Sequence, residues 1–135
     1  SDRYRQEWDK LGRPAETLPN IGITRHIVVA DTDAQAQRIA AGAYAHWREA
    51  MEWIWRRGGV PFTLKDIYPA DFPALAAIGH GIAGSPATVR DYIAQLKDEA
   101  GVNYVLCQMV FGDMNFTDAE HSIRLFAREV MPAFV

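Results

Sequence analysis

The 135-residue sequence has a single cysteine, Cys107, which excludes an internal disulfide framework and a cysteine-rich metal site. It has no apolar run close to the ~20 residues that span a bilayer, and no basic-then-apolar leader at its start. The 14 Lys and Arg residues and 17 Asp and Glu residues give a net charge of -3 without a block of like charge, unlike the basic face of a general nucleic-acid binder. We therefore expect a cytoplasmic protein with no membrane or nucleic-acid partner.

Several catalytic signatures are also missing. The sequence holds no phosphate-binding loop, dinucleotide-binding glycine motif, His-Glu-x-x-His metal motif, paired cysteines or Gly-x-Ser-x-Gly elbow. We therefore predict no metal site, and motifs alone leave the catalytic residues unassigned. The 49% hydrophobic content is enough for one domain with a core, and no repeat or linker divides it.

Apolar periodicity predicts helices that alternate with strands. Expected strands cover 24–30, 79–84 and 102–111, and expected helices cover 2–11, 33–56 and 86–100. A capping box, Thr32-x-x-Gln35, begins the second helix, and a similar pattern, Thr117-x-x-Glu120, predicts the start of a last one. Because no hairpin turn separates the strands, the order predicts a parallel sheet of the α/β class.

The segment 58–78 interrupts this alternation. It contains Pro61, Pro69 and Pro73 and shows no sustained hydrophobic period. We predict an irregular excursion with one helical turn near its end, of the kind that often shapes a binding site.

Gln108 is the candidate ligand-facing residue of the last strand. Val105, Cys107 and Met109 share one apolar face of that strand, and this face should meet helices. Gln108 then points to the other face, near the carboxyl end where parallel α/β folds bind ligands. The alternative is an amide that is hydrogen-bonded within the fold. We expect Cys107 to pack as a small hydrophobe rather than act as a nucleophile.

Two further patterns suit ligand binding. Gly84 and Ser85 precede a helix whose first N–H groups suit a phosphate, although the same residues also make an ordinary cap. His80, between two glycines, and His26, in the first strand, have a side chain that titrates near neutral pH, but a lone histidine is often structural. We expect His121 to be solvated.

Six stretches spread over nearly the whole chain share the pattern of one enzyme family. They are RHIVVADTD at 25–33, YAHW at 44–47, GIAGSPATV at 81–89, AGVNYV at 100–105, FGDM at 111–114 and SIRLFAREVMP at 122–132. In these stretches the sequence resembles the carboxyl-terminal part of the bacterial luciferase-like monooxygenases, which are flavin enzymes with a (β/α)8 barrel fold. The segment 58–78 falls where that family varies its substrate lid.

The resemblance implies that the three expected strands are the sixth, seventh and eighth of a TIM barrel, and that residues 1–12 end its fifth helix. Such a barrel needs about 200 to 250 residues. Residues 1–135 would then form a single partial domain, incomplete as a barrel, with 58–78 as a lid-like excursion.

The resemblance also implies roles for particular residues. Trp47 is similar to a tryptophan linked to the flavin site, and the implied cofactor-binding residues are Trp47, Gly84, Ser85 and Gln108. The implied substrate-pocket residues are His80, Phe111 and Asp113. No catalytic residue is implied, because the family's base and most of its flavin contacts lie outside the matched part.

The resulting hypothesis is a piece of a monooxygenase that uses reduced FMN and oxygen to oxidise a small organic substrate, inactive as an isolated chain. A deazaflavin-dependent oxidoreductase of the same fold fits the sequence equally. A hypothesis of another class is a non-catalytic fragment that forms a homo-oligomer, or joins a missing amino-terminal half, through open sheet edges. We do not expect a doubly wound module, because it would need an open sheet of only three strands.

Overall fold

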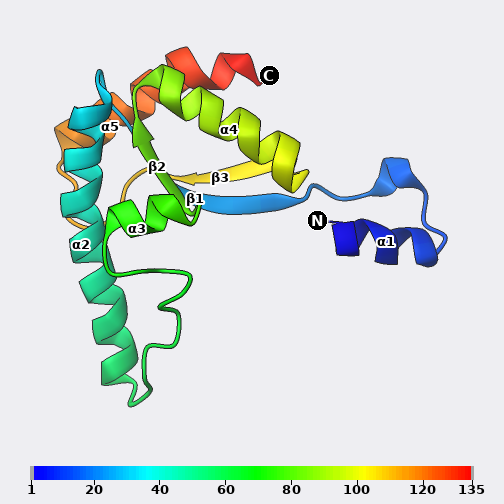
Figure 1. Cartoon of the computed structure of the whole chain (residues 1–135), viewed down its shortest axis with the longest axis horizontal. Helices are drawn as coiled ribbons and strands as arrows, with labels where there is room; N and C mark the ends of the chain where they lie inside the picture. Colours follow the sequence, from blue (N-terminus) through cyan, green and yellow to red (C-terminus); the bar gives the residue numbers. More distant parts are fainter. Residues whose placement is uncertain (1, 135) are drawn as a thin grey trace.

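The computed structural model describes residues 2–134 and contains one parallel sheet with helices around it (Figure 1). In chain order the main elements are α1 (Asp2–Lys10), β1 (Gly22–Val29), α2 (Asp33–Arg57), α3 (Phe72–Ala77), β2 (Gly81–Gly84), α4 (Pro86–Ala100), β3 (Tyr104–Gln108) and α5 (Phe116–Leu125). Short turns of other helix types cover Ala15–Thr17, Phe126–Val130 and Met131–Ala133. The prediction of an α/β chain with parallel strands is confirmed.

The strands lie in the order β2-β1-β3, with β1 in the middle. The first five residues of β1 pair with β3, in the register Gly22↔Tyr104 to His26↔Gln108. Its last four residues pair with β2, from His26↔Gly81 to Val29↔Gly84. The two outer strands are therefore staggered, and His26 is the position of β1 that both of them reach.

The helices cover both faces of this sheet. Val28 of β1 packs with α2, α3 and Ala83, whereas Ile27 and Val29 pack with Val89 of α4 and with the end of α5. Alternate residues of one strand thus enter two separate cores, as a strand covered on both sides requires. Figure 1 shows α3 and α4 on opposite sides of the strands.

This architecture overturns the expectation of the carboxyl-terminal portion of a TIM barrel. In such a barrel each strand pairs with the next along the chain and all helices lie outside. The strand at 81–84 would then lie between the other two, and the inner face of the sheet would carry no helix. Here β1 is central and the connections from β1 to β2 and from β2 to β3 run in opposite directions. Right-handed crossovers in opposite directions place their helices on opposite faces. The described residues form a compact domain with an open three-stranded sheet, the arrangement we did not expect.

The helix ends show which local signals were decisive. The Thr32 side chain accepts a hydrogen bond from the Gln35 backbone N–H, and Ser85 caps α4 in the same way. Gly101 ends α4 in the left-handed conformation, with φ at 58°. The expected capping box at Thr117 is wrong, because α5 begins two residues earlier and its cap is Asn115, which accepts from the Asp118 N–H.

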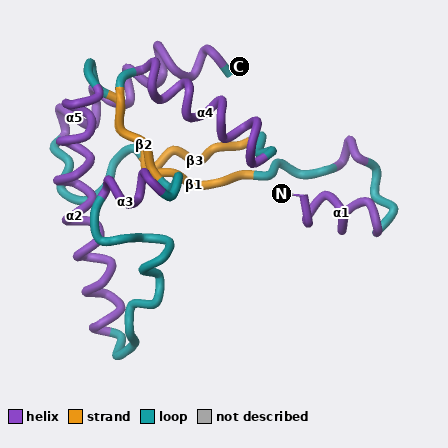
Figure 2. Tube along the Cα trace, in the orientation of Figure 1, coloured by secondary structure: helices purple, strands orange, loops and turns teal. Residues whose placement is uncertain are grey.

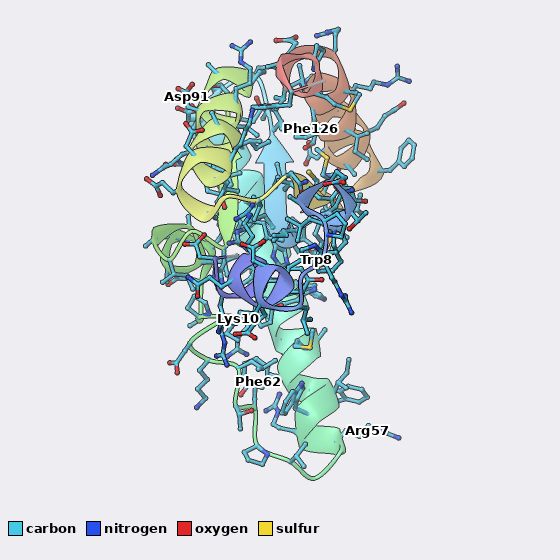
Figure 3. All side chains as sticks on the ribbon, turned by 90° about the vertical axis from the view of Figure 1, so that its right-hand side faces the viewer. Trp8, Lys10, Arg57, Phe62, Asp91 and Phe126 are labelled. Carbon is cyan, nitrogen blue, oxygen red and sulfur yellow. The ribbon has the colours of Figure 1, made fainter. Side chains whose placement is uncertain are left out.

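The excursion after α2 folds back along that helix, as the long loop in Figure 2 shows. The Tyr44 hydroxyl donates to the Pro69 carbonyl at 3.0 Å and the Arg48 Nε donates to the Tyr68 carbonyl at 2.9 Å. Phe62 is buried under the Arg48 guanidinium, 4.1 Å from its ring centre, and Figure 3 shows it against the lower part of α2. The helical turn predicted near the end of this segment is α3. Whether the excursion acts as a lid stays a prediction.

Ser122 of α5 completes the backbone pairing of β1 where β3 ends. Its Oγ accepts a hydrogen bond of 2.9 Å from the Val29 N–H, and both residues are 1% exposed. On the side of β1 that faces β3, the hydroxyl of a helix residue thus accepts the hydrogen bond that a backbone carbonyl of a longer β3 would accept. No helix among the described residues is long and apolar enough to cross a membrane.

Candidate functional site

His26 is the centre of the most unusual cluster in the described chain. It faces α2 because it shares the face of β1 that carries Val28, and it is 3% exposed. Its imidazole lies edge-to-face against Trp47 at 4.6 Å and Phe111 at 4.8 Å between ring centres, and against Tyr44 at 5.6 Å and Tyr68 at 6.4 Å. Three helix or loop segments and one strand therefore build a box of rings around one polar side chain.

Burial in this box keeps the imidazole neutral. Desolvation lowers the pKa of His26 from 6.5 to about 4, since the charged form loses its water and gains no acidic partner. The Nε2 atom is buried and has no hydrogen-bond partner among the described residues. A buried polar atom without a partner is uncommon and calls for an explanation such as a ligand or an ordered water.

A small pocket adjoins this histidine. Its volume is about 110 Å³, and its lining residues are Thr24, Arg25, His26, Ile67, Tyr68, His80 and Gln108. We call it the His26 pocket. The excursion forms one wall, where the His80 Nδ1 lies 3.1 Å from the Ile67 carbonyl. Because a carbonyl only accepts, this bond places a proton on Nδ1 and leaves Nε2 of a neutral His80 as an acceptor.

The structure brings four of the predicted site residues together here. His80 and Gln108 line the His26 pocket, and Trp47 and Phe111 pack on the His26 ring behind it. Trp47 reaches this place because α2 runs back along the sheet, so a residue about 20 Å along the helix lies beside the middle of β1. The apolar face of β3 meets the α4 and α5 side as predicted, and Gln108 points away from it.

Gly84 and Ser85 lie at the other end of β2, apart from the residues that line the pocket. The Asp33 carboxylate accepts from the Ser85 N–H at 2.6 Å and from the Thr88 hydroxyl at 2.8 Å. The Ser85 backbone bond is the main reason that the pKa of Asp33 is lowered. A Cβ added at Gly84 would lie 2.7 Å from Thr88, so a glycine is required there. The start of α4 is thus occupied by a carboxylate of the chain itself.

Asp113 is also outside the pocket lining. It lies in the exposed loop after β3, where one of its carboxylate oxygens is 3.6 Å from the His46 Nδ1 on α2. His121, expected to be solvated, contacts Asp31 at 3.2 Å between Nε2 and Oδ1 and is partly exposed. No group of three or more metal-ligating side chains occurs among residues 2–134.

Arg25 and Tyr68 are pocket residues that the sequence did not single out. Arg25 sits between Thr24 and His26 in a strand whose alternation directs only every second side chain to one face, so its part in the lining had no local signal. Tyr68 belongs to the excursion, which has no period to place it. The polar pair Arg25-His26 in a largely apolar strand was the one signal that a site lies near β1, because buried polar groups need partners. It did not point to Tyr68.

A second, larger hollow lies along α5 and the loop before it. Its volume is about 580 Å³ and it is lined by Val110, Met114, Phe116, Ala119, Glu120, Ile123 and Arg124. We call it the α5 groove. Phe116 is 79% exposed and Val110 is 57% exposed, so much of this groove is open apolar surface.

The fold and the site define an open, three-layer α/β domain with a buried histidine at the middle strand. A scan against protein-family models finds no match. An uncharacterised protein from Sinorhizobium fredii, y4wF, is 28% identical over 111 residues, which are 82% of this chain and 32% of that protein.

Two solved structures resemble the chain. The monooxygenase RslO1 from Streptomyces bottropensis aligns with 98% of it and 36% of its own chain, with a TM-score of 0.66 and 20% identity. The apo form of MsnO8 aligns with 87% of it and 36% of its own chain, with a TM-score of 0.50 and 23% identity. The chain therefore spans about a third of the length of the proteins it matches.

Proposed function

We propose that the chain is part of a flavin-dependent monooxygenase of the luciferase-like family, which oxidises a small organic substrate with reduced FMN and oxygen. The observation that supports this most directly is the alignment of nearly the whole chain with the monooxygenase RslO1. The six stretches of family-like sequence point the same way. A deazaflavin-dependent oxidoreductase on the same type of chain is the alternative within this class.

The described residues do not enclose a flavin. Pockets for cofactor-sized ligands measure about 300 to 1,000 Å³, and the His26 pocket is about 110 Å³. The α5 groove is about 580 Å³, but it is open apolar surface and none of the expected cofactor-binding residues lines it. The Ser85 N–H, an expected phosphate donor, is bonded to Asp33, and Trp47 is packed on the His26 ring. Under this proposal the flavin site needs residues beyond this chain, and the chain contributes His80, Gln108 and the aromatic box to the substrate side.

The test uses this chain, the full-length y4wF protein, and a hybrid in which this chain replaces the matched 111 residues of y4wF. Each is titrated with FMN and with a deazaflavin, oxidised and then anaerobically reduced, by fluorescence and calorimetry. We expect saturable binding by y4wF and the hybrid and no micromolar binding by this chain alone. If neither y4wF nor the hybrid binds a flavin or a deazaflavin, the proposal is wrong.

A matched pair of variants in the hybrid tests the site. Gln108→Leu should impair substrate oxidation, because it removes a donor and an acceptor from the pocket. Gln37→Leu, on the exposed surface of α2, should leave it unchanged. Equal effects of the two variants would remove Gln108 from the site.

Self-association is a second candidate, favoured by the open edge of β3. That strand pairs on one side only, and Tyr104 and Leu106 on it, with Val110 just after it, are 46–57% exposed. Glu120 and Arg124, which pair with each other at 2.8 Å, both line the adjoining α5 groove, so the groove offers a second copy a largely apolar surface without an unpaired charge. We propose a second copy of the chain as the partner at this edge.

Sedimentation of this chain across a range of concentrations tests the second candidate. We expect a dimer that Leu106→Lys converts to a monomer, because a charge on an edge strand opposes strand pairing. Ile54→Lys, at an exposed position near the end of α2, is the matched control and should leave the dimer intact. A chain that stays monomeric at high concentration would rule this candidate out.

A further inference from the structure

The His26 pocket contains a cation that lacks an acidic partner. Arg25 lines the pocket and enters none of the ion pairs found among the described residues. Its Nη1 donates to the Thr24 carbonyl at 2.8 Å, and its Nε is buried without any hydrogen-bond partner. A partly buried guanidinium with an unused donor is costly unless an anion satisfies it.

The other lining residues add donors and no competing charge. No Asp or Glu lines the pocket. The Gln108 amide has no side-chain hydrogen bond among the described residues and offers two N–H donors. Burial raises the pKa of the Tyr92 phenol, and the charge of Arg25, together with a hydrogen bond between the two side chains, opposes that rise in part. The pocket is therefore a site of positive potential inside a chain whose net charge is -3.

The size of the pocket limits what it holds. A water molecule occupies about 30 Å³ in the liquid, so a pocket of about 110 Å³ admits a group the size of a few waters. A carboxylate with one or two carbons has this size. Its planar pair of oxygens also matches the planar fork of a guanidinium, which binds carboxylates through two parallel hydrogen bonds.

We propose that the His26 pocket binds the carboxylate group of a small organic acid, with the Arg25 guanidinium as its charge partner and the Gln108 amide as a second donor. The two histidines respond to the bound anion. The His80 Nδ1 donates to the Ile67 carbonyl and the ring lines the pocket, so a bound anion changes the surroundings of that ring. The bound carboxylate also brings an oxygen close to the His26 Nε2 atom, which has no hydrogen-bond partner among the described residues.

This inference goes beyond the proposed function, because it requires no flavin and no further polypeptide. It is tested on the 135-residue chain alone by proton NMR of the histidine rings, with acetate added at constant ionic strength. The chain has four histidines. His26 and His80 line the pocket, whereas His46 and His121 lie elsewhere and serve as internal controls.

We expect acetate to shift the His26 and His80 resonances saturably, in the millimolar range for so small a probe, and to leave His46 and His121 in place. Acetamide has the same shape without the charge and should bind at least about tenfold more weakly, as expected for a charge-assisted bond. Arg25→Gln should weaken acetate binding by a similar factor, and Arg38→Gln, on the exposed surface of α2, should not.

Three results would overturn the proposal. The first is an equal response to acetate and acetamide, and the second is a shift of His46 and His121 as large as that of His26 and His80. The third is no response to acetate at about 100 mM, because binding weaker than this has too small a free energy for a specific site. Inorganic phosphate that binds at least about tenfold more tightly than acetate would overturn the carboxylate assignment. If Arg25→Gln fails to fold, the comparison of acetate with acetamide on the unmodified chain decides the question. None of these results depends on flavin binding, so the two proposals fail separately.

Discussion

The contact between Ser122 and Val29 provides a direct test of the sheet arrangement. The Val29 N–H points to the side of β1 where β3 has ended, and the Ser122 Oγ accepts it at 2.9 Å. Ser122→Ala removes the acceptor and leaves a backbone donor that is 1% exposed and out of reach of water. An orphaned buried donor costs about 1 to 3 kcal/mol. We expect the free energy of unfolding to fall by that amount.

Urea unfolding followed by circular dichroism measures this loss. The midpoint should fall while the slope of the transition is unchanged, because the surface exposed on unfolding stays the same. Hydrogen exchange at the Val29 amide should accelerate, since that amide loses its only acceptor. Thr63→Ala, at an exposed position in the excursion, is the control and should change stability by less than about 0.5 kcal/mol.

A specific result would refute the reasoning. If Ser122→Ala unfolds like the unmodified chain and the Val29 amide exchanges at an unchanged rate, then another group must accept that proton. A neighbouring strand is the group that would do so in a sheet whose strands pair in chain order. The experiment therefore tests the helix-for-strand substitution and the observed strand order together.

Two further perturbations follow from particular contacts. Gly112→Ala should destabilise the chain by roughly 3 kcal/mol or more in urea unfolding, because its φ is 61° and the new Cβ would lie 1.8 Å from the Ala43 carbonyl oxygen. The control is Gly42→Ala, next to Ala43 on α2 with open space around it, which should stabilise the chain by up to about 1 kcal/mol. Equal effects of the two substitutions would contradict the close approach of Gly112 to Ala43. The pKa of His26 is lowered from 6.5 in the unfolded chain to about 4 in the folded chain, so the unfolded chain binds the proton more tightly. The free energy of unfolding should therefore be highest above pH 6.5 and should decrease as the pH falls to 4. This loss is about 3 kcal/mol at most, and urea unfolding should show that His26→Phe removes it, whereas an unchanged pH profile in that variant would assign it to other groups.

Local signals in the sequence predicted the helices well and the sheet poorly. Ser85, Pro86 and Gly101 fix both ends of α4 through caps that depend on near neighbours only. The last strand was predicted over 102–111 and covers Tyr104–Gln108, because the chain leaves the sheet early and turns Phe111 towards α2. Strand order has no local signal, since apolar patterns say that a strand is buried and not which strand lies beside it.

The candidate site was predicted in its parts and missed at its centre. Trp47, His80, Gln108 and Phe111 do gather, although they come from four different segments. His26 was singled out only as a titratable side chain that is often structural, because its box of rings exists only after α2 and the excursion fold back over β1. A motif search reads spacing along the chain, and this cluster has none.

The fold also explains why an anion site belongs at Arg25 and not at the start of α4. Asp33 lies in the first turn of α2, where an acidic residue is favoured by the helix dipole. In the folded chain its carboxylate accepts a hydrogen bond from the Ser85 N–H at the start of α4. A carboxylate already bound there repels a second anion, so the helix start that looked suited to phosphate is satisfied internally. Arg25 has no such partner among the described residues. Within residues 2–134 the chain supplies a charge partner at the start of α4 and none at Arg25, and this difference leaves Arg25 free to take an anionic ligand.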